Sequence, residues 1–225
     1  MVDGNNGGRE EIYAQLREEI VTLRRAPGSP ISDKLLSQER SISRTPVREA
    51  LLKLADEGLV QVIPRSGTYV SRINLGMLRD AQFVRIALEI EAVQDAARCA
   101  SKSDFRALER IIGQQTAIAG QMREMAEFYR LDEQFHRTIF EIGKRDGVWP
   151  VLERAKTQLQ RMRYISLGDT GRQAMVIKEH QAIISAIAQG DATLASETMR
   201  AHIDAAFAKT FQNMELLRTA IDPTG

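Results

Sequence analysis

The sequence is short of cysteine, of aromatic residues and of long apolar runs. Cys99 is the only cysteine, so no intrachain disulfide is possible, which is consistent with a reducing cytoplasm. No apolar run approaches the roughly 20 residues that a membrane-spanning helix needs. Aromatic residues make up only 5% of the chain, and this scarcity, beside many Ala, Leu, Ile, Met, Glu and Arg residues, favours helices over sheets.

Net charge is also nearly absent. The formal net charge is +1, which excludes a polycation, so any binding of nucleic acid must come from a local patch. Residues 34–53 contain such a patch, although on charge alone it is typical of a solvated helix face. Its basic members are Lys34, Arg40, Arg44, Arg48 and Lys53, against the acidic Glu39 and Glu49.

The length of 225 residues is enough for two modest domains, each with its own core. The start of the chain, from Met1 to Gly8, is polar and rich in Gly and Asn. It lacks the apolar stretch of a signal peptide, and we expect a disordered leader there.

The segment from Ser41 to Leu51 is typical of the turn and second helix of a DNA-binding helix-turn-helix. Ser43 and Thr45 are placed to cap a helix, and Pro46 suits its first turn. Arg44 and Arg48 lie four residues apart and therefore project from one face. The opposite face is apolar and consists of Val47, Ala50, Leu51 and Leu54.

The flanking residues complete a winged arrangement. Apolar spacing predicts an amphipathic helix before the motif, and Ser32 can cap a short helix leading into it. Two runs rich in β-branched residues follow, separated by Pro64-Arg65-Ser66-Gly67, and they predict a β-hairpin wing. The expected helices cover residues 9–25, 33–39 and up to 57, and the expected strands cover residues 59–63 and 68–73.

The remainder of the chain is expected to be helical. Breaks near residues 101–103, 120, 143–147, 168–171 and 190–191 separate six segments of roughly 17–27 residues with apolar positions at helical spacing. Long segments joined by short loops predict an antiparallel helical bundle. The domain boundary should fall near Asn74-Leu75-Gly76.

The three histidines of the chain have informative positions. Asp132 and His136 are four residues apart and share a helix face. His180 lies ten residues before the turn at Gly190 and His202 lies twelve after it, so both are about 15–18 Å from the turn. A lone histidine is usually a core or surface residue. Three at matched heights beside an aspartate predict a site for zinc, nickel or manganese.

Residues 9–73 resemble the winged-helix DNA-binding domain of the GntR family of bacterial regulators. The resemblance rests on three pieces of sequence: Ser43-Arg44-Thr45-Pro46-Val47-Arg48-Glu49-Ala50-Leu51, Glu57-Gly58-Leu59-Val60 and Gly67-Thr68-Tyr69-Val70. By this resemblance Arg44 and Arg48 should reach guanine edges and phosphates, and Thr45 and Lys34 should contact the DNA backbone. Gly67 should let the wing tip, which also carries Arg65, approach the minor groove.

One departure from the family pattern concerns the turn. The family usually has Leu-Gly where Arg40-Ser41 stand in this sequence. Serine adopts the turn conformation less easily than glycine, so we expect a slightly rearranged turn. Arg40 adds a charge that could contact phosphate.

Residues 76–215 resemble the FCD ligand-binding domain of the FadR-like branch of the same family. The matching pieces are Arg85-Ile86-Ala87-Leu88-Glu89, Asp132-Glu133-Gln134-Phe135-His136, Glu179-His180-Gln181-Ala182-Ile183 and Met199-Arg200-Ala201-His202-Ile203. The resemblance implies that Asp132, His136, His180 and His202 hold a divalent metal. It also implies that Arg85 contacts the effector. Arg163 is a second candidate to bind a carboxylate.

These observations predict a mainly α protein, with an N-terminal winged helix-turn-helix and a C-terminal antiparallel six-helix bundle of the FCD type. We expect a cytoplasmic regulator that binds operator DNA as a homodimer and responds to a small carboxylate at its metal. In one alternative the metal is purely structural. In the other the metal serves an enzyme, but no histidine is left as a general base, and Glu133 and Glu179 should point away along their helices.

Overall fold

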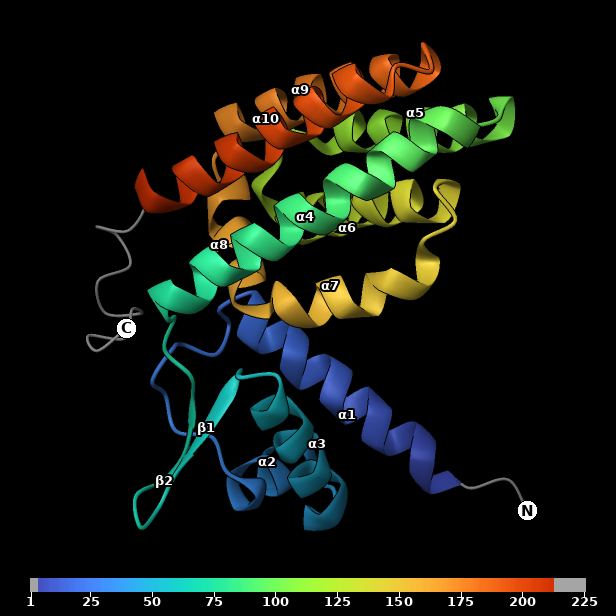
Figure 1. Cartoon of the computed structure of the whole chain (residues 1–225). Helices are drawn as coiled ribbons and strands as arrows, with labels where there is room; N and C mark the ends of the chain where they lie inside the picture. The colour runs from blue at the N-terminus through green and yellow to red at the C-terminus, as the bar shows by residue number, and fades with distance from the viewer. Residues whose placement is uncertain (1–3, 213–225) are drawn as a thin grey trace. The chain divides into compact units, whose positions relative to one another are not determined.

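The computed structural model describes residues 4–212, which form two compact units divided between Leu78 and Arg79. The N-terminal unit contains a set of helices and a β-hairpin (Figure 1). Its elements are α1 (Gly4–Val21), α2 (Asp33–Arg40), α3 (Arg44–Asp56), β1 (Val60–Ile63) and β2 (Gly67–Val70).

The core of the N-terminal unit lies where α3 packs against α1, α2 and β1. Apolar residues three or four apart give each helix one buried face. Leu16 and Ile20 on α1 and Val47 and Leu54 on α3 are all buried in this way. These contacts hold α3 with its polar face outward.

The ends of α1 differ from the prediction. The helix begins at Gly4, so residues 4–8 are helical rather than a disordered leader, and Met1 to Asp3 lie outside the described residues. It ends at Val21, because the chain turns away at Leu23, which has a φ of 59°.

The turn between α2 and α3 is built by serines. The Ser32 side chain caps α2, as predicted, by accepting a hydrogen bond from the Leu35 N–H at 3.1 Å. Ser41 ends α2 in the left-handed region, with a φ of 55°. Ser43 occupies the N-cap position of α3 without a side-chain cap hydrogen bond, and Thr45 lies inside the helix. In the described residues, therefore, neither hydroxyl supplies the predicted cap.

The wing is a two-stranded antiparallel hairpin with Val60 opposite Val70 and Ile63 opposite Gly67. Its second strand is shorter than predicted and ends at Val70. Arg65 and Gly67 at the tip both have positive φ, 63° and 133°.

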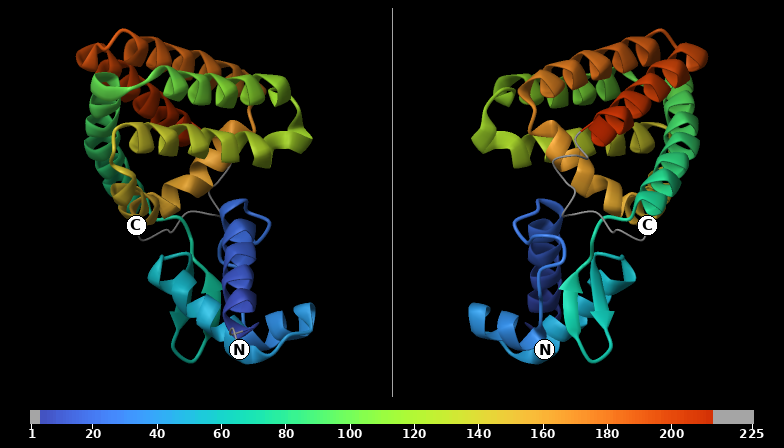
Figure 2. Two further views of the ribbon diagram at one scale, coloured as in Figure 1. Left: turned by 90° about the vertical axis from the view of Figure 1, so that its right-hand side faces the viewer. Right: turned by 90° about the vertical axis from the view of Figure 1, so that its left-hand side faces the viewer.

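The C-terminal unit is helical. Its elements are α4 (Leu75–Cys99), α5 (Lys102–Ile118), η1 (Met122–Glu124), α6 (Met125–Ile142), η2 (Asp146–Val148), α7 (Trp149–Ala155), α8 (Thr157–Leu167), α9 (Thr170–Ala188) and α10 (Ala192–Gln212). The division between the units falls within α4. Helix α5 packs against α6 and α9, and α9 packs along α10 (Figure 2). None of the helices in residues 4–212 is long and apolar enough to cross a membrane.

The interior of the bundle is mostly aliphatic, with a few aromatic rings. Buried side chains from α4, α5, α6, α9 and α10 form one continuous cluster. Representative members are Val93, Leu108, Ile111, Phe128, Phe135, Ile139, Ile183, Ile187, Met199 and Ile203. The polar residues enclosed by this apolar shell therefore need partners inside the bundle.

The predicted fourth segment of the bundle is two helices. Helices α7 and α8 are separated at Lys156, whose side chain is buried. The Lys156 ammonium donates to Glu133 Oε2 at 2.6 Å and lies 4.0 Å from the centre of the Trp149 ring. The mainly α fold is confirmed, but the described bundle has one more helix than the six segments predicted.

Candidate metal centre and nucleic-acid interface

Four side chains with metal-binding atoms meet inside the C-terminal unit. Asp132 and His136 lie one turn apart on α6, His180 lies on α9 and His202 on α10. One ligand atom from each residue lies within 4.8 Å of all the others, and all four residues are buried. The structure thus brings together the four residues that the spacing singled out.

Each of the three imidazole rings is held at Nδ1 by an acceptor on another helix. The acceptors come from α4, α5 and α9, so the ring orientations are set by most of the bundle. His180 is hydrogen-bonded to Gln115 at 3.1 Å and His202 to Glu179 at 2.7 Å, whereas His136 lies 2.7 Å from Glu89 in a close ion-pair contact without hydrogen-bond geometry. Such an outer acceptor places the proton on Nδ1 and leaves the Nε2 lone pair for coordination.

The inner atoms of the cluster fit a divalent ion. Nε2 of His136 and Nε2 of His202 are 3.2 Å apart, as expected for two nitrogens each about 2.1 Å from one metal. Nε2 of His180 lies 3.5 Å from an Asp132 oxygen and has no hydrogen-bond partner among the described residues. Lone pairs and a carboxylate that face one another repel unless a cation lies between them. The donor set therefore suits a borderline divalent metal.

The electrostatics of the cluster favour a neutral imidazole at His180 and at His202. Burial lowers the pKa of His202 to about 4, and burial together with the neighbouring His202 and His136 lowers the pKa of His180 well below its usual value. Burial alone would raise the pKa of Glu89, but Arg85 and His136 hold it well below its usual range. A neutral His180 and a neutral His202 beside ionised carboxylates are in the protonation state that coordinates metals.

Arg85, the predicted effector ligand, lies one turn before Glu89 on α4 and is buried. Its Nε donates to Glu89 Oε1 at 2.6 Å, and its Nη2 donates to Oε2 at 3.4 Å. Oε2 is also the oxygen beside His136. Arg85 is therefore connected to a candidate metal ligand through one carboxylate.

Arg163, the second predicted effector residue, supports the cluster from α8. Its guanidinium bonds the second carboxylate oxygen of Asp132, and its Nη1 donates to Glu133 Oε1 at 2.5 Å. Burial raises the pKa of Glu133, but Lys156 and Arg163 lower it to about 2. This geometry orients Asp132, while a contact between Arg163 and an effector stays a prediction.

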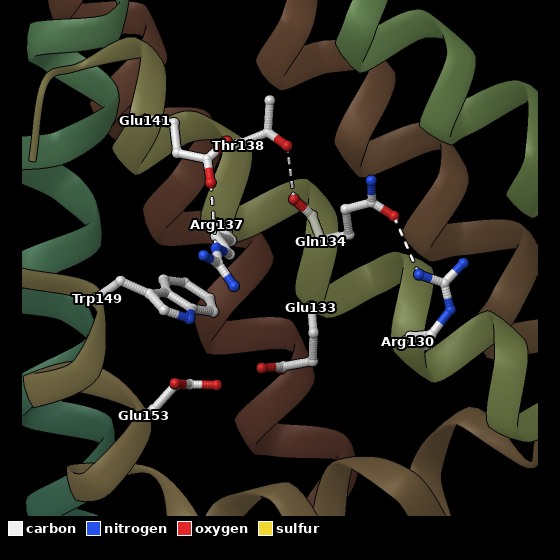
Figure 3. A pocket seen from close by; sticks show the side chains of 8 residues that line it. All are labelled: Arg130, Glu133, Gln134, Arg137, Thr138, Glu141, Trp149 and Glu153. Carbon is white, nitrogen blue, oxygen red and sulfur yellow. Dashed lines mark hydrogen bonds and ion pairs between the residues drawn. The ribbon is translucent and has the colours of Figure 1, made fainter. Parts of the chain in front are cut away.

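Glu133 also lines a hollow of about 390 Å³ between α6 and α7 (Figure 3). In this view Glu133 and Arg137 on α6 face Trp149 and Glu153 on α7. Arg137 is paired with Glu141 at 3.1 Å, so the charges on the α6 side are largely satisfied. The hollow is thus linked to the candidate metal ligands through Glu133 and Arg163.

The predicted DNA-contacting residues gather on the N-terminal unit. They are Lys34, Arg44, Thr45, Arg48, Arg65 and Gly67, and all six are exposed. Arg40 differs from its expected role, because it donates to Glu19 at 2.6 Å and thereby ties α2 to α1.

The two arginines of α3 have different surroundings. Arg44 is held by Asp33 through hydrogen bonds of 2.8 to 3.2 Å. Arg48 makes no side-chain hydrogen bond or ion pair among the described residues, although its charge helps to lower the pKa of Asp33. It lines a hollow of about 280 Å³ together with Asp33, Leu52 and Val62.

Several residues with clear roles were missed from the sequence. Glu89 could have been found as the i+4 partner of Arg85. The roles of Gln115 and Lys156 could not be recognised from the sequence, because their partners lie on other helices. Glu133 and Glu179 were expected to point away from the cluster, but both support it: Glu133 contacts Arg163, which holds Asp132, and Glu179 contacts the candidate ligand His202.

Comparison with known proteins identifies both halves of the chain. Residues 9–70 match the family described as bacterial regulatory proteins, gntR family, and residues 80–205 match the FCD domain. The HTH-type transcriptional repressor RspR of Escherichia coli K12 is 34% identical over 194 residues, which cover 86% of this chain and 85% of that protein. An uncharacterised HTH-type transcriptional regulator of Streptomyces ambofaciens is 36% identical over 210 residues, covering 88% and 83%.

Solved structures support the fold. Escherichia coli McbR/YncC superposes with a TM-score of 0.78 at 18% identity and covers 92% of this chain and 98% of its own. A putative GntR regulator from Rhodococcus sp. RHA1 gives a TM-score of 0.73 at 19% identity, with the same coverage. The matched families and relatives are transcriptional regulators and not enzymes, so the enzymatic alternative is set aside. The chain belongs to the GntR family, as a transcriptional regulator with an N-terminal gntR-type DNA-binding domain and a C-terminal FCD domain.

Proposed function

We propose that this protein controls transcription in response to a small organic acid that binds at a divalent metal in the FCD bundle. One observation carries the proposal. Three imidazoles and a carboxylate converge within 4.8 Å, while an acceptor oxygen from another helix lies close to the opposite nitrogen of each ring. A cluster built only for packing has no need to aim lone pairs at one point.

Asp132, His136, His180 and His202 would hold the ion, with zinc as our first choice and nickel or manganese as alternatives. When bound, the ion supplies fixed positive charge in an apolar interior, where an anion is otherwise costly to bury. Four protein ligands leave room for one or two further oxygens on a five- or six-coordinate ion. A carboxylate is suited to that place.

Arg85 and Arg163 are the candidate partners for the rest of the effector. Both guanidiniums already bind carboxylates of the protein, Glu89 for Arg85 and Asp132 for Arg163. An acid that enters the bundle would share or replace these partners. Because Arg85 and Glu89 lie on α4, the helix that follows the wing in sequence, such an exchange would act on the connection between the two units.

Operator binding would use the six exposed residues of the N-terminal unit: Lys34, Arg44, Thr45, Arg48, Arg65 and Gly67. A homodimer would present two such surfaces and would therefore recognise two half-sites. The relative RspR is named a repressor, and we propose repression and a cytoplasmic location for this protein.

The sensing half of the proposal is tested by thermal unfolding of metal-loaded and chelator-treated protein with a panel of small organic acids. A ligand that binds only the folded state raises Tm. We expect at least one acid to stabilise the loaded protein and not the stripped protein. If stripping lowers Tm but no acid shifts either form, the metal is structural and the sensing proposal is wrong.

The DNA half is tested by Arg48→Ala, because Arg48 is exposed and makes no side-chain hydrogen bond or ion pair among the described residues. We expect operator binding to weaken by about 1–3 kcal/mol with unchanged unfolding. Unchanged affinity would remove Arg48 from the interface. Light scattering should give twice the chain mass of 25.2 kDa, whereas a monomer would contradict the two-half-site proposal.

A further inference from the structure

The carboxylate of Asp33 lies among the basic residues that we propose for DNA binding. Asp33 is the first residue of α2, and Arg44 is the first residue of α3. Lys34 and Arg48 flank this pair, and both are exposed. An acid at this position repels DNA phosphates, so its presence needs a physical reason.

An acid in the first turn of α2 favours the start of that helix, but its ion pair with Arg44 adds little stability. The Asp33 side chain is 25% exposed and that of Arg44 is 65% exposed. Ion pairs at this level of exposure contribute about 0–1 kcal/mol, because water screens the charges and ordering the side chains costs entropy. The pair is more useful for the direction that it imposes on the guanidinium.

The hydrogen bonds fix which edge of the guanidinium is used. Asp33 accepts from Nε at 3.2 Å and from Nη2 at 3.0 and 2.8 Å. The Nε side of Arg44 is therefore covered. The outer edge, formed by Nη1 and the second Nη2 hydrogen, is left to donate, and a pair of parallel donors of this kind matches O6 and N7 of guanine.

We propose that Asp33 determines operator specificity by holding Arg44 with its Nη1/Nη2 edge toward the bases, so that Arg44 reads a guanine instead of binding a phosphate. The proposal rests on the DNA contact of Arg44 made above. Arg48 supplies the comparison within the same helix: its charge helps to lower the pKa of Asp33, but no hydrogen bond to that carboxylate fixes its direction among the described residues. Asp33 is thus a positioning residue, and its effect should appear in sequence discrimination more than in total affinity.

The experiment uses the full chain and a duplex selected by that chain from a random-sequence pool. Each guanine of the half-site is replaced in turn, and a shuffled duplex of the same composition measures non-specific binding. For the wild type, we expect replacement of one guanine to weaken binding about 5- to 150-fold. In Asp33→Asn the same replacement should cost less than threefold, and binding to the shuffled duplex should be equal or tighter.

Three variants make the result specific. Arg44→Ala should lose the same guanine preference, and Asp33→Asn added to Arg44→Ala should change nothing further. Asp56→Asn removes an acid from the other end of α3, and Ser32→Ala weakens the α2 cap. Both should keep the wild-type preference.

The outcomes separate the two proposals. If Asp33→Asn keeps the full guanine penalty while Arg44→Ala abolishes it, Arg44 reads the base without help and the role of Asp33 is overturned. If Arg44→Ala binds like the wild type, the DNA contact of Arg44 fails as well. If Ser32→Ala relaxes the preference as much as Asp33→Asn does, the effect belongs to the folding of α2 and not to the ion pair.

Discussion

Glu179 decides which nitrogen of His202 is available, because its carboxylate lies 2.7 Å from Nδ1 and leaves Nε2 to face His136. Arg172 holds the same carboxylate at 2.6 and 2.9 Å. Burial alone would raise the pKa of Glu179, but His202 and Arg172 lower it. An ionised carboxylate in this position makes the imidazole a stronger ligand.

Glu179→Gln should therefore weaken metal binding by about 10- to 100-fold while the bundle stays folded. The measurement is a competition for zinc against a chromophoric chelator. Glu197→Gln, an exposed change on α10, is the matched control and should leave zinc affinity unchanged. Equal affinity in Glu179→Gln and the wild type would show that this carboxylate does not support a ligand.

Ser41 is the residue at which the family pattern and this chain differ. Its φ of 55° places a side chain where glycine is normally favoured. We expect Ser41→Gly to stabilise the N-terminal unit by up to about 1 kcal/mol, and Ser41→Ala to give no gain because it keeps the β-carbon. Urea unfolding of the three proteins measures the difference, and a destabilised glycine variant would show that the Ser41 side chain contributes more than its strain costs.

How much of the candidate site could be predicted depends on the range of its interactions. Asp132 and His136 are recognisable because helix periodicity places them on one face, and the turn at Gly190 aligns His180 with His202. Gln115 could not be predicted as the partner of His180, because 65 residues separate them in sequence and their contact depends on how α5 meets α9. The Asp33–Arg44 pair depends in the same way on the angle between two short helices.

At the scale of the elements, two glycines differ in the space around them. Gly143 ends α6 against α4, and a β-carbon there would lie 2.8 Å from the carbonyl oxygen of Ala92. Gly113 in α5 is the opposite case, because no atom among the described residues lies within 4 Å of such a carbon. The same substitution should therefore have opposite signs at the two sites.

Gly143→Ala should destabilise the bundle by about 1–3 kcal/mol, because α4 must move away from α6. Gly113→Ala should stabilise it by roughly 0.5–1 kcal/mol, because alanine loses less freedom in a helix. The comparison uses the midpoints of urea unfolding, provided that the dependence of the unfolding free energy on urea concentration is the same for both variants. If both variants shifted the midpoint in the same direction, the close contact between α4 and α6 would be wrong.

The helices were predictable where apolar periodicity was strong, and less so where one buried polar residue redirects the chain. The segment from Trp149 to Leu167 has helical composition throughout, so its interruption could not be predicted. The interruption occurs at Lys156, whose ammonium donates to Glu133. Burial lowers the pKa of this lysine through desolvation, although Glu133 acts in the opposite direction. A lysine that is buried because its partner lies on another helix cannot be recognised from the residues next to it in sequence.

At the scale of the whole molecule, the candidate metal centre connects most of the C-terminal unit. Its ligands come from α6, α9 and α10, and the acceptors behind them come from α4, α5 and α9. The N-terminal unit supplies none of the four residues in the cluster. Metal binding should therefore stabilise one unit and leave the other unchanged.

Hydrogen exchange before and after chelation of zinc-loaded protein measures this difference. A metal present at a hundred times its Kd stabilises the folded state by about 2.7 kcal/mol, so amides in the ligand-bearing helices should exchange up to about a hundredfold faster once it is removed. Amides in α1, α2 and α3 should keep their rates, which serves as the internal control. Unchanged exchange in α6, α9 and α10 would show that zinc is not bound there, because helices that share ligands of one ion cannot lose it without losing protection.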